Sequence, residues 1–212
     1  MDVERHSDKT MIGKARHCDA ASHGMIRFVE SRPAHIDSTK QGLAEDRTAL
    51  EQALMTFYKP AMIAYMRAHP DAYEEAVALA IADKQPYSWR AAWLLCDCID
   101  EDDPRIRRHV KRIIRAIEGK EDGHQRELLK ILHRMKLSAR DEGLAFDACV
   151  GLWEKIDAQP SVRVNALKLL VSIARRYPEL VRELRFLTQE RYLASCSLPV
   201  RRSIARILKG LD

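Results

Sequence analysis

A pattern of apolar residues that recurs four times constrains the fold of this 212-residue chain more than any other feature. The four units begin at Trp89, Gln125, Arg163 and Arg201, which are 36, 38 and 38 residues apart. In every unit the residues three, four, six, seven and ten positions after the first are apolar, as on one face of an α-helix. A repeat of this length has room for one pair of helices, and such pairs bury their apolar faces by stacking. The sequence therefore predicts an all-α fold, a right-handed α-solenoid.

Prolines and polar turn residues divide the repeat region into about four helix pairs. We expect 71–83 to pair with 87–100, 104–118 with 124–137, 140–157 with 161–176, and 178–194 with 198–210. Pro104 and Pro178 lie where a helix can begin, because the first turn of a helix leaves its N–H groups unpaired. Residues 1–42 show no sustained period and are predicted to be a poorly ordered leader, irregular or partly helical. The solenoid is expected over 43–212 and is regular from about residue 71.

Composition excludes several classes of protein. The longest apolar runs, 76–82 and 91–96, are too short to cross a bilayer, so we expect no membrane partner. The first 24 residues are polar and lack the apolar segment of a secretory signal. Five cysteines form no even, closely spaced framework, which favours a cytoplasmic protein with free thiols.

Charge is unevenly distributed along the chain. Residues 104–212 contain 24 Lys and Arg against 13 Asp and Glu, whereas residues 1–103 contain 12 against 18. Such asymmetry is typical of a half that binds polyanions, and it is also typical of the solvated surface of arginine-rich helices. Both interpretations remain open at this point.

One set of cations recurs at equivalent positions of the second helices. In a solenoid these positions line up along the concave face, and five residues into each unit stand Leu94, Lys130, Lys168 and Arg206. One residue into each unit the sequence has arginine in three of the four cases. The predicted basic stripe consists of Arg90, Arg126, Lys130, Lys168, Arg202 and Arg206. It is a candidate site for phosphates or for an acidic partner, and the alternative is a set of solubilising charges.

Three segments resemble HEAT-like repeat proteins. The run Asp157-Ala-Gln-Pro-Ser-Val-Arg has the turn followed by Val-Arg of that family, Leu198-Pro-Val-Arg repeats it, and Ser88-Trp-Arg is a variant. The resemblance covers about residues 70–212, and small bacterial HEAT-like repeat proteins of unassigned function are the most similar. The period is near the short end for HEAT units, and the second repeat lacks the turn proline. The resemblance implies binding of protein or nucleic acid along a concave surface and does not imply an enzyme.

Three hypotheses for function follow. The first is a non-enzymatic scaffold with a protein partner, and the alternative is a nucleic-acid-binding module that uses the basic stripe. The third is an enzyme similar to the HEAT-like alkylated-DNA glycosylases, with Trp89, Trp93 and Asp97 as its site. These tryptophans lie in or beside the core register, which instead favours a packing role. Cys96 and Cys98 point to different sides of a helix and cannot chelate a metal together, so we expect no metal. The sequence has no Gly-rich phosphate loop and no His-Glu-x-x-His motif, and we expect no cofactor. The sequence does not predict an oligomeric state.

Overall fold

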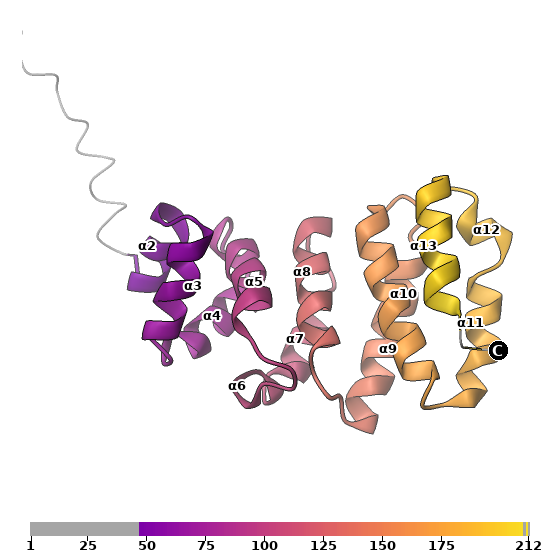
Figure 1. Cartoon of the computed structure of the whole chain (residues 1–212), viewed down its shortest axis with the longest axis horizontal. Helices are drawn as coiled ribbons and strands as arrows, with labels where there is room; N and C mark the ends of the chain where they lie inside the picture. The colour runs from indigo at the N-terminus through magenta and orange to yellow at the C-terminus, as the bar shows by residue number, and fades with distance from the viewer. Residues whose placement is uncertain (1–46, 210, 212) are drawn as a thin grey trace, which may run out of the picture.

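The protein is a row of helix pairs stacked side by side (Figure 1). The computed structural model describes residues 47–209 and 211, so the predicted leader at 1–42 lies outside the described residues. All elements in the described part are helical. They are α2 (Ala49–Thr56), α3 (Lys59–Ala68), α4 (Ala72–Ile81), α5 (Tyr87–Cys98), α6 (Pro104–Arg107), α7 (Val110–Ala116), α8 (Asp122–His133), α9 (Ala139–Glu154), α10 (Pro160–Ala174), η1 (Pro178–Leu180), α11 (Val181–Leu187), α12 (Glu190–Leu193) and α13 (Leu198–Leu208).

The helices form two layers. The second helices of successive pairs, α3, α5, α8, α10 and α13, contact one another in that order. The first helices, α4, α6 with α7, and α9, form the layer behind them. This arrangement confirms an all-α stack of pairs, with α2 and α3 as one pair before the four that the repeat predicts. No helix in the described part has the length and hydropathy of a membrane span.

Side-chain caps explain where several first helices begin. Thr48 caps α2: its hydroxyl accepts from the Glu51 N–H at 3.1 Å, and Glu51 in turn accepts from the Thr48 N–H. Ser138 accepts from the Asp141 N–H at 3.2 Å at the start of α9. Asp103 accepts from the Arg105 N–H at 2.9 Å before Pro104, the first residue of α6. These caps pair N–H groups that a helix cannot pair internally.

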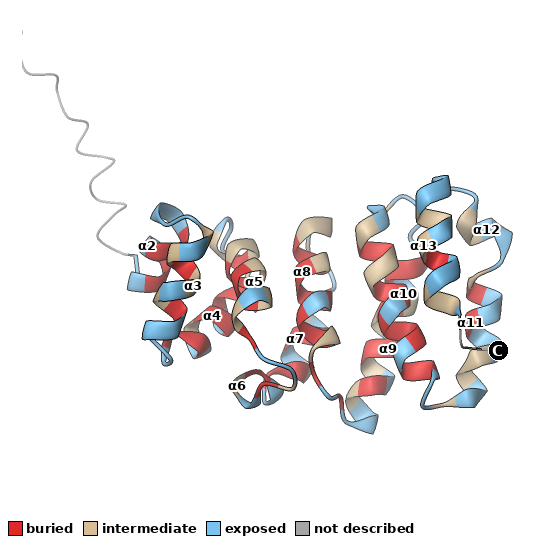
Figure 2. Ribbon diagram, viewed as in Figure 1, coloured by how far each residue is buried: buried red, intermediate tan, exposed pale blue. Residues whose placement is uncertain are grey.

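The hydrophobic core runs between the two layers and follows the repeat (Figure 2). All ten repeat positions in the units that begin at Gln125 and Arg163 are buried. In the last unit only Ile204 is buried and Ala205 is exposed, because α13 packs on α10 and has no second helix beyond it in the described part. Core burial therefore depends on having a neighbour on both sides.

Two of the predicted first helices are interrupted. The segment expected as one helix over 104–118 is divided into α6 and α7, and in the turn between them Arg108 and the buried His109 both contact Glu74 of α4. The segment expected over 178–194 is divided into η1, α11 and α12. Its break follows Thr188, whose hydroxyl donates to the Leu184 carbonyl at 2.8 Å and so competes with the helical hydrogen bonds.

Candidate binding face of the second helices

The predicted basic stripe does not extend onto α5. Leu94, the α5 equivalent of Lys130, was expected to face away from the core, and this expectation is wrong because Leu94 is buried. The reason is that α5 contacts α2 and α3 on one side and α8 on the other. Arg90 is partly buried, and its Nε is enclosed with no hydrogen-bond partner in the described structure.

Two cations of the stripe share one buried carboxylate on α8 as their ion-pair partner. Glu127 is fully buried, and its carboxylate lies 2.8 Å from Arg126 and 2.9 Å from Lys130. Removing either cation would leave a charge in the interior with one partner fewer, which is costly. Arg126 and Lys130 therefore have a structural role, and one of their two positive charges is compensated by Glu127 within the helix.

The remaining three cations have no such compensation. Lys168 on α10 and Arg202 and Arg206 on α13 are exposed, and α13 packs directly on α10. Among the described residues none of the three has an ion-pair partner, and neither helix contains an aspartate or glutamate. We call these three residues the α10–α13 cationic patch. Its positive charge is unopposed by its own two helices.

An aromatic pair lies on the same layer, on α5. Trp89 and Trp93 are one turn apart and stack with ring centroids at 6.3 Å and an interplanar angle of 16°. Both are partly exposed. The ammonium of Lys59 on α3 lies 5.1 Å from the Trp93 centroid and 2.9 Å from the Asp97 carboxylate. Asp97 is therefore paired with a cation that the sequence reasoning missed, because the contact joins two helices, α3 and α5, and no local pattern indicates it.

The cysteines are poor candidates for chemistry. Burial, and then the nearby Glu127 carboxylate, raise the pKa of Cys96, and burial raises the pKa of Cys98 to about 11 and that of Cys149 to about 12. Such thiols stay protonated near neutral pH, whereas the thiolate is the nucleophile and metal ligand. Within residues 47–209 and 211, no three His, Cys, Asp or Glu side chains are grouped to hold a metal ion.

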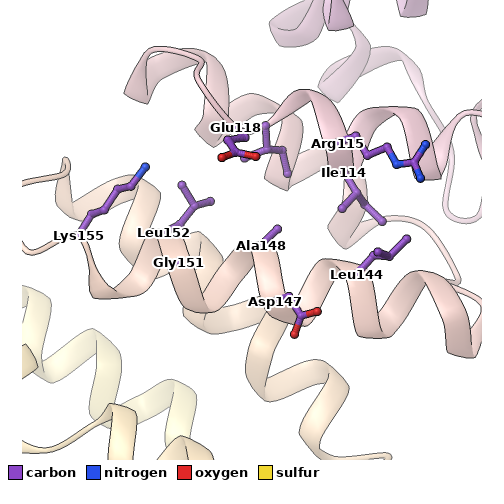
Figure 3. A pocket seen from close by; sticks show the side chains of 10 residues that line it. Ile114, Arg115, Glu118, Leu144, Asp147, Ala148, Gly151, Leu152 and Lys155 are labelled. Carbon is purple, nitrogen blue, oxygen red and sulfur yellow. The ribbon is translucent and has the colours of Figure 1, made fainter.

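A groove of about 400 Å³ lies in the opposite layer, between α7 and α9 (Figure 3). Its apolar lining comes from Ile114 of α7 and Leu144, Ala148 and Leu152 of α9. Charged side chains on its rim are Arg115, Glu118, Asp147 and Lys155. Sequence reasoning missed this groove. Its signal is the exposed Gly151, where α9 carries no side chain to fill the surface beside it.

Comparison with known families agrees with this architecture. A family model described as a HEAT repeat domain matches residues 46–211. The chain belongs to the HEAT repeat domain family, and its stacked helix pairs are those of a repeat scaffold. Neither a comparison with curated proteins nor one with solved structures finds a match.

Proposed function

We propose that this HEAT-repeat protein is a non-enzymatic scaffold that binds another protein through the outward face of α5, α8, α10 and α13. Its membership of a family of repeat scaffolds, which commonly mediate protein interactions, supports the general role. The free thiols of Cys96, Cys98, Cys149 and Cys196 support the cytoplasmic location predicted from the sequence.

The observation that carries the proposal is the unopposed charge of the α10–α13 cationic patch. Many other cations of the protein are already paired, as Arg105 is with Asp103 at 2.6 Å and Arg107 is with Asp102 at 2.6 Å. Lys168, Arg202 and Arg206 instead present three cations on two adjacent helices. We infer that the patch binds an acidic segment of the partner, because complementary charge favours that encounter and its orientation.

A nucleic acid is the weaker candidate for the same face. Proteins that follow a phosphate backbone use many cations along their length, and here Arg126 and Lys130 are occupied by Glu127. The three free cations are confined to α10 and α13. A single strand bound only through them would show a slope of log K against log salt near −2, from about −0.7 per contact.

The test is fluorescence polarisation with a labelled octamer of glutamate and a labelled single-stranded DNA, each titrated at about 50 and 200 mM salt. The variant K168E/R202E/R206E reverses the patch. The control R115E/R140E/R182E makes the same change of net charge at three exposed arginines on α7, α9 and α11. We expect the native protein and the control to bind the acidic peptide, and the patch variant to bind it at least tenfold more weakly.

Equal loss in both variants would mean that net charge alone attracts the peptide, and it would overturn the patch. Tighter binding of the DNA, with a salt slope well beyond −2, would favour the nucleic-acid alternative and a site larger than the patch. Circular dichroism and a thermal melt of each variant establish that the compared proteins are folded.

A further inference from the structure

The Trp89–Trp93 pair is only partly buried, although tryptophan gains most when it is fully buried. Trp93 packs partly against the hydrophobic core, but Trp89 does not belong to the core cluster. Trp89 lies instead over the first turn of α8, where a Cβ added to Gly123 would be 3.5 Å from its Nε1. Among the described residues the Trp89 backbone N–H donates to Gln85, whereas its indole N–H makes no hydrogen bond. The ring is thus held at the surface between α5 and α8, with a free donor.

A large aromatic side chain in this setting is typical of a binding anchor. Tryptophan is enriched among the few residues that supply most of the binding energy of protein interfaces. Its ring buries a large area when a partner covers it, and its N–H can then find an acceptor. The flanking cations already have ion-pair partners, Lys59 in Asp97 and both Arg126 and Lys130 in Glu127. The α5 end of the second-helix layer therefore offers apolar contact, and the α10–α13 end offers charge.

The separation of the two ends defines the length of a ligand that reaches both. From α5 to α10 there are two helix steps, through α8, in one layer. At about 8–10 Å per step, the separation is roughly 16–20 Å. An extended chain covers about 3.3 Å per residue, so it needs five or six residues to cover this distance.

We propose that the face binds one extended segment of a partner protein in two places. An apolar side chain of that segment docks on Trp89 and Trp93, and a run of aspartates or glutamates five or six residues away pairs with Lys168, Arg202 and Arg206. This inference rests on the proposed function, and it adds the apolar anchor and the spacing to it.

The experiment compares three labelled peptides by fluorescence polarisation. The first has four glutamates followed by glycines and serines, the second adds two leucines six residues from the glutamates, and the third places the leucines next to them. The protein variants are W89A and the control Y58A, which removes an aromatic side chain that is 75% exposed at the start of α3. We expect the second peptide to bind the native protein and Y58A at least tenfold more tightly than the other two.

In W89A this advantage should disappear while the binding of the first peptide stays unchanged. Tryptophan emission gives a second readout in the native protein. The second peptide should shift the emission of the exposed pair, whereas Trp153 is fully buried and supplies a constant background. This readout needs no variant, so it holds even if W89A folds poorly.

Equal affinity for the three peptides, or an advantage that W89A retains, would overturn the anchor. If the first peptide still bound and K168E/R202E/R206E abolished that binding, the proposed function would stand without it. Failure of all three peptides to bind would overturn both proposals. Single-stranded DNA that bound more tightly than the second peptide and lost affinity in W89A would assign the anchor to nucleobases instead.

Discussion

Arg163 connects three segments of the chain from a buried position. Its side chain is 2% exposed, and its Nε donates to the Trp153 carbonyl at 3.0 Å. Its terminal nitrogens donate to the Tyr192 carbonyl at 2.6 Å and to the Ser195 hydroxyl at 3.0 Å. The guanidinium also lies 4.6 Å from the centroid of the Trp153 ring. This residue begins a repeat unit in the sequence, and its contacts show why a cation occupies that position.

We expect R163M to lower the free energy of unfolding by about 3 kcal/mol or more, because the buried Trp153 carbonyl and the partly buried Tyr192 carbonyl lose their charged donor. Urea denaturation of the full chain measures the change. The matched control is K168M, an exposed side chain without an ion pair among the described residues, which should change stability by less than about 0.5 kcal/mol. A loss below about 1 kcal/mol in R163M would show that the carbonyls are paired in another way.

Two histidines make stability depend on pH. Burial lowers the pKa of His124 and His133, although each contacts a backbone carbonyl, Ala80 at 2.7 Å and Asn165 at 3.0 Å. With a lowered pKa in the folded state, the unfolded chain binds more protons. The stabilisation is therefore complete above the unfolded pKa near 6.5 and is lost as the pH falls below it.

We expect the urea midpoint to decrease when the pH is lowered from 7.5 to 5.5. Each histidine should lower the free energy of unfolding by at most about 1.4 kcal/mol per pH unit. H124Q should show a smaller fall over the same interval, since the substituted residue does not titrate. A midpoint that stays constant or rises on acidification would contradict the assignment.

At the scale of elements, backbone conformation separates two kinds of glycine. Gly119, which follows α7, has φ at +76°, a conformation that L-residues adopt only with strain. Gly143 lies inside α9, and an added Cβ there meets nothing within 4 Å. We expect G119A to destabilise the protein by roughly 1 kcal/mol and G143A to stabilise it by about 0.5–1 kcal/mol. Thermal melts of the two variants in parallel test this, and destabilisation by G143A would indicate an unrecognised contact on α9.

The repeat period predicted the second helices well and the first helices less well. The helices α8 and α10 overlap the expected ranges 124–137 and 161–176, and each begins and ends a few residues earlier than expected. Their apolar faces are buried, and the period reflects this directly. The breaks at Arg108–His109 and after Thr188 depend on contacts with Glu74 and Leu184. Local periodicity does not contain those contacts, so it predicted one continuous helix in each case.

For the candidate site, the sequence predicted position but not environment. The register placed Lys168, Arg202 and Arg206 at the surface, and they are exposed. It could not show that Leu94 is covered by neighbouring helices or that the next residue in the chain, Glu127, compensates Arg126. Which charges are free is a property of tertiary packing, because it depends on partners that are brought together by the fold.

At the scale of the whole molecule, contacts between neighbouring pairs determine stability. Buried carboxylates join one pair to the next: Glu51 of α2 lies 2.5 Å from Lys84, which precedes α5, and Glu142 of α9 accepts from the Tyr177 hydroxyl at 2.7 Å. Each pair contacts mainly its neighbours, so opening of one end need not unfold the other. The molecule should therefore show a gradient of local stability.

Hydrogen exchange should reveal this gradient with its minimum at α12 and α13. Ile204 is the one buried residue in α12 and α13 together, whereas α8 has seven buried residues and α10 has nine. Amides of α12 and α13 should therefore exchange first, because local opening there exposes little apolar surface. In R163M, which loses the contacts to Tyr192 and Ser195, exchange in α12 and α13 should accelerate further, while exchange in α3 to α5 stays unchanged. Uniform acceleration along the chain would mean that the stack unfolds as a single cooperative unit, and it would contradict the nearest-neighbour description of this solenoid.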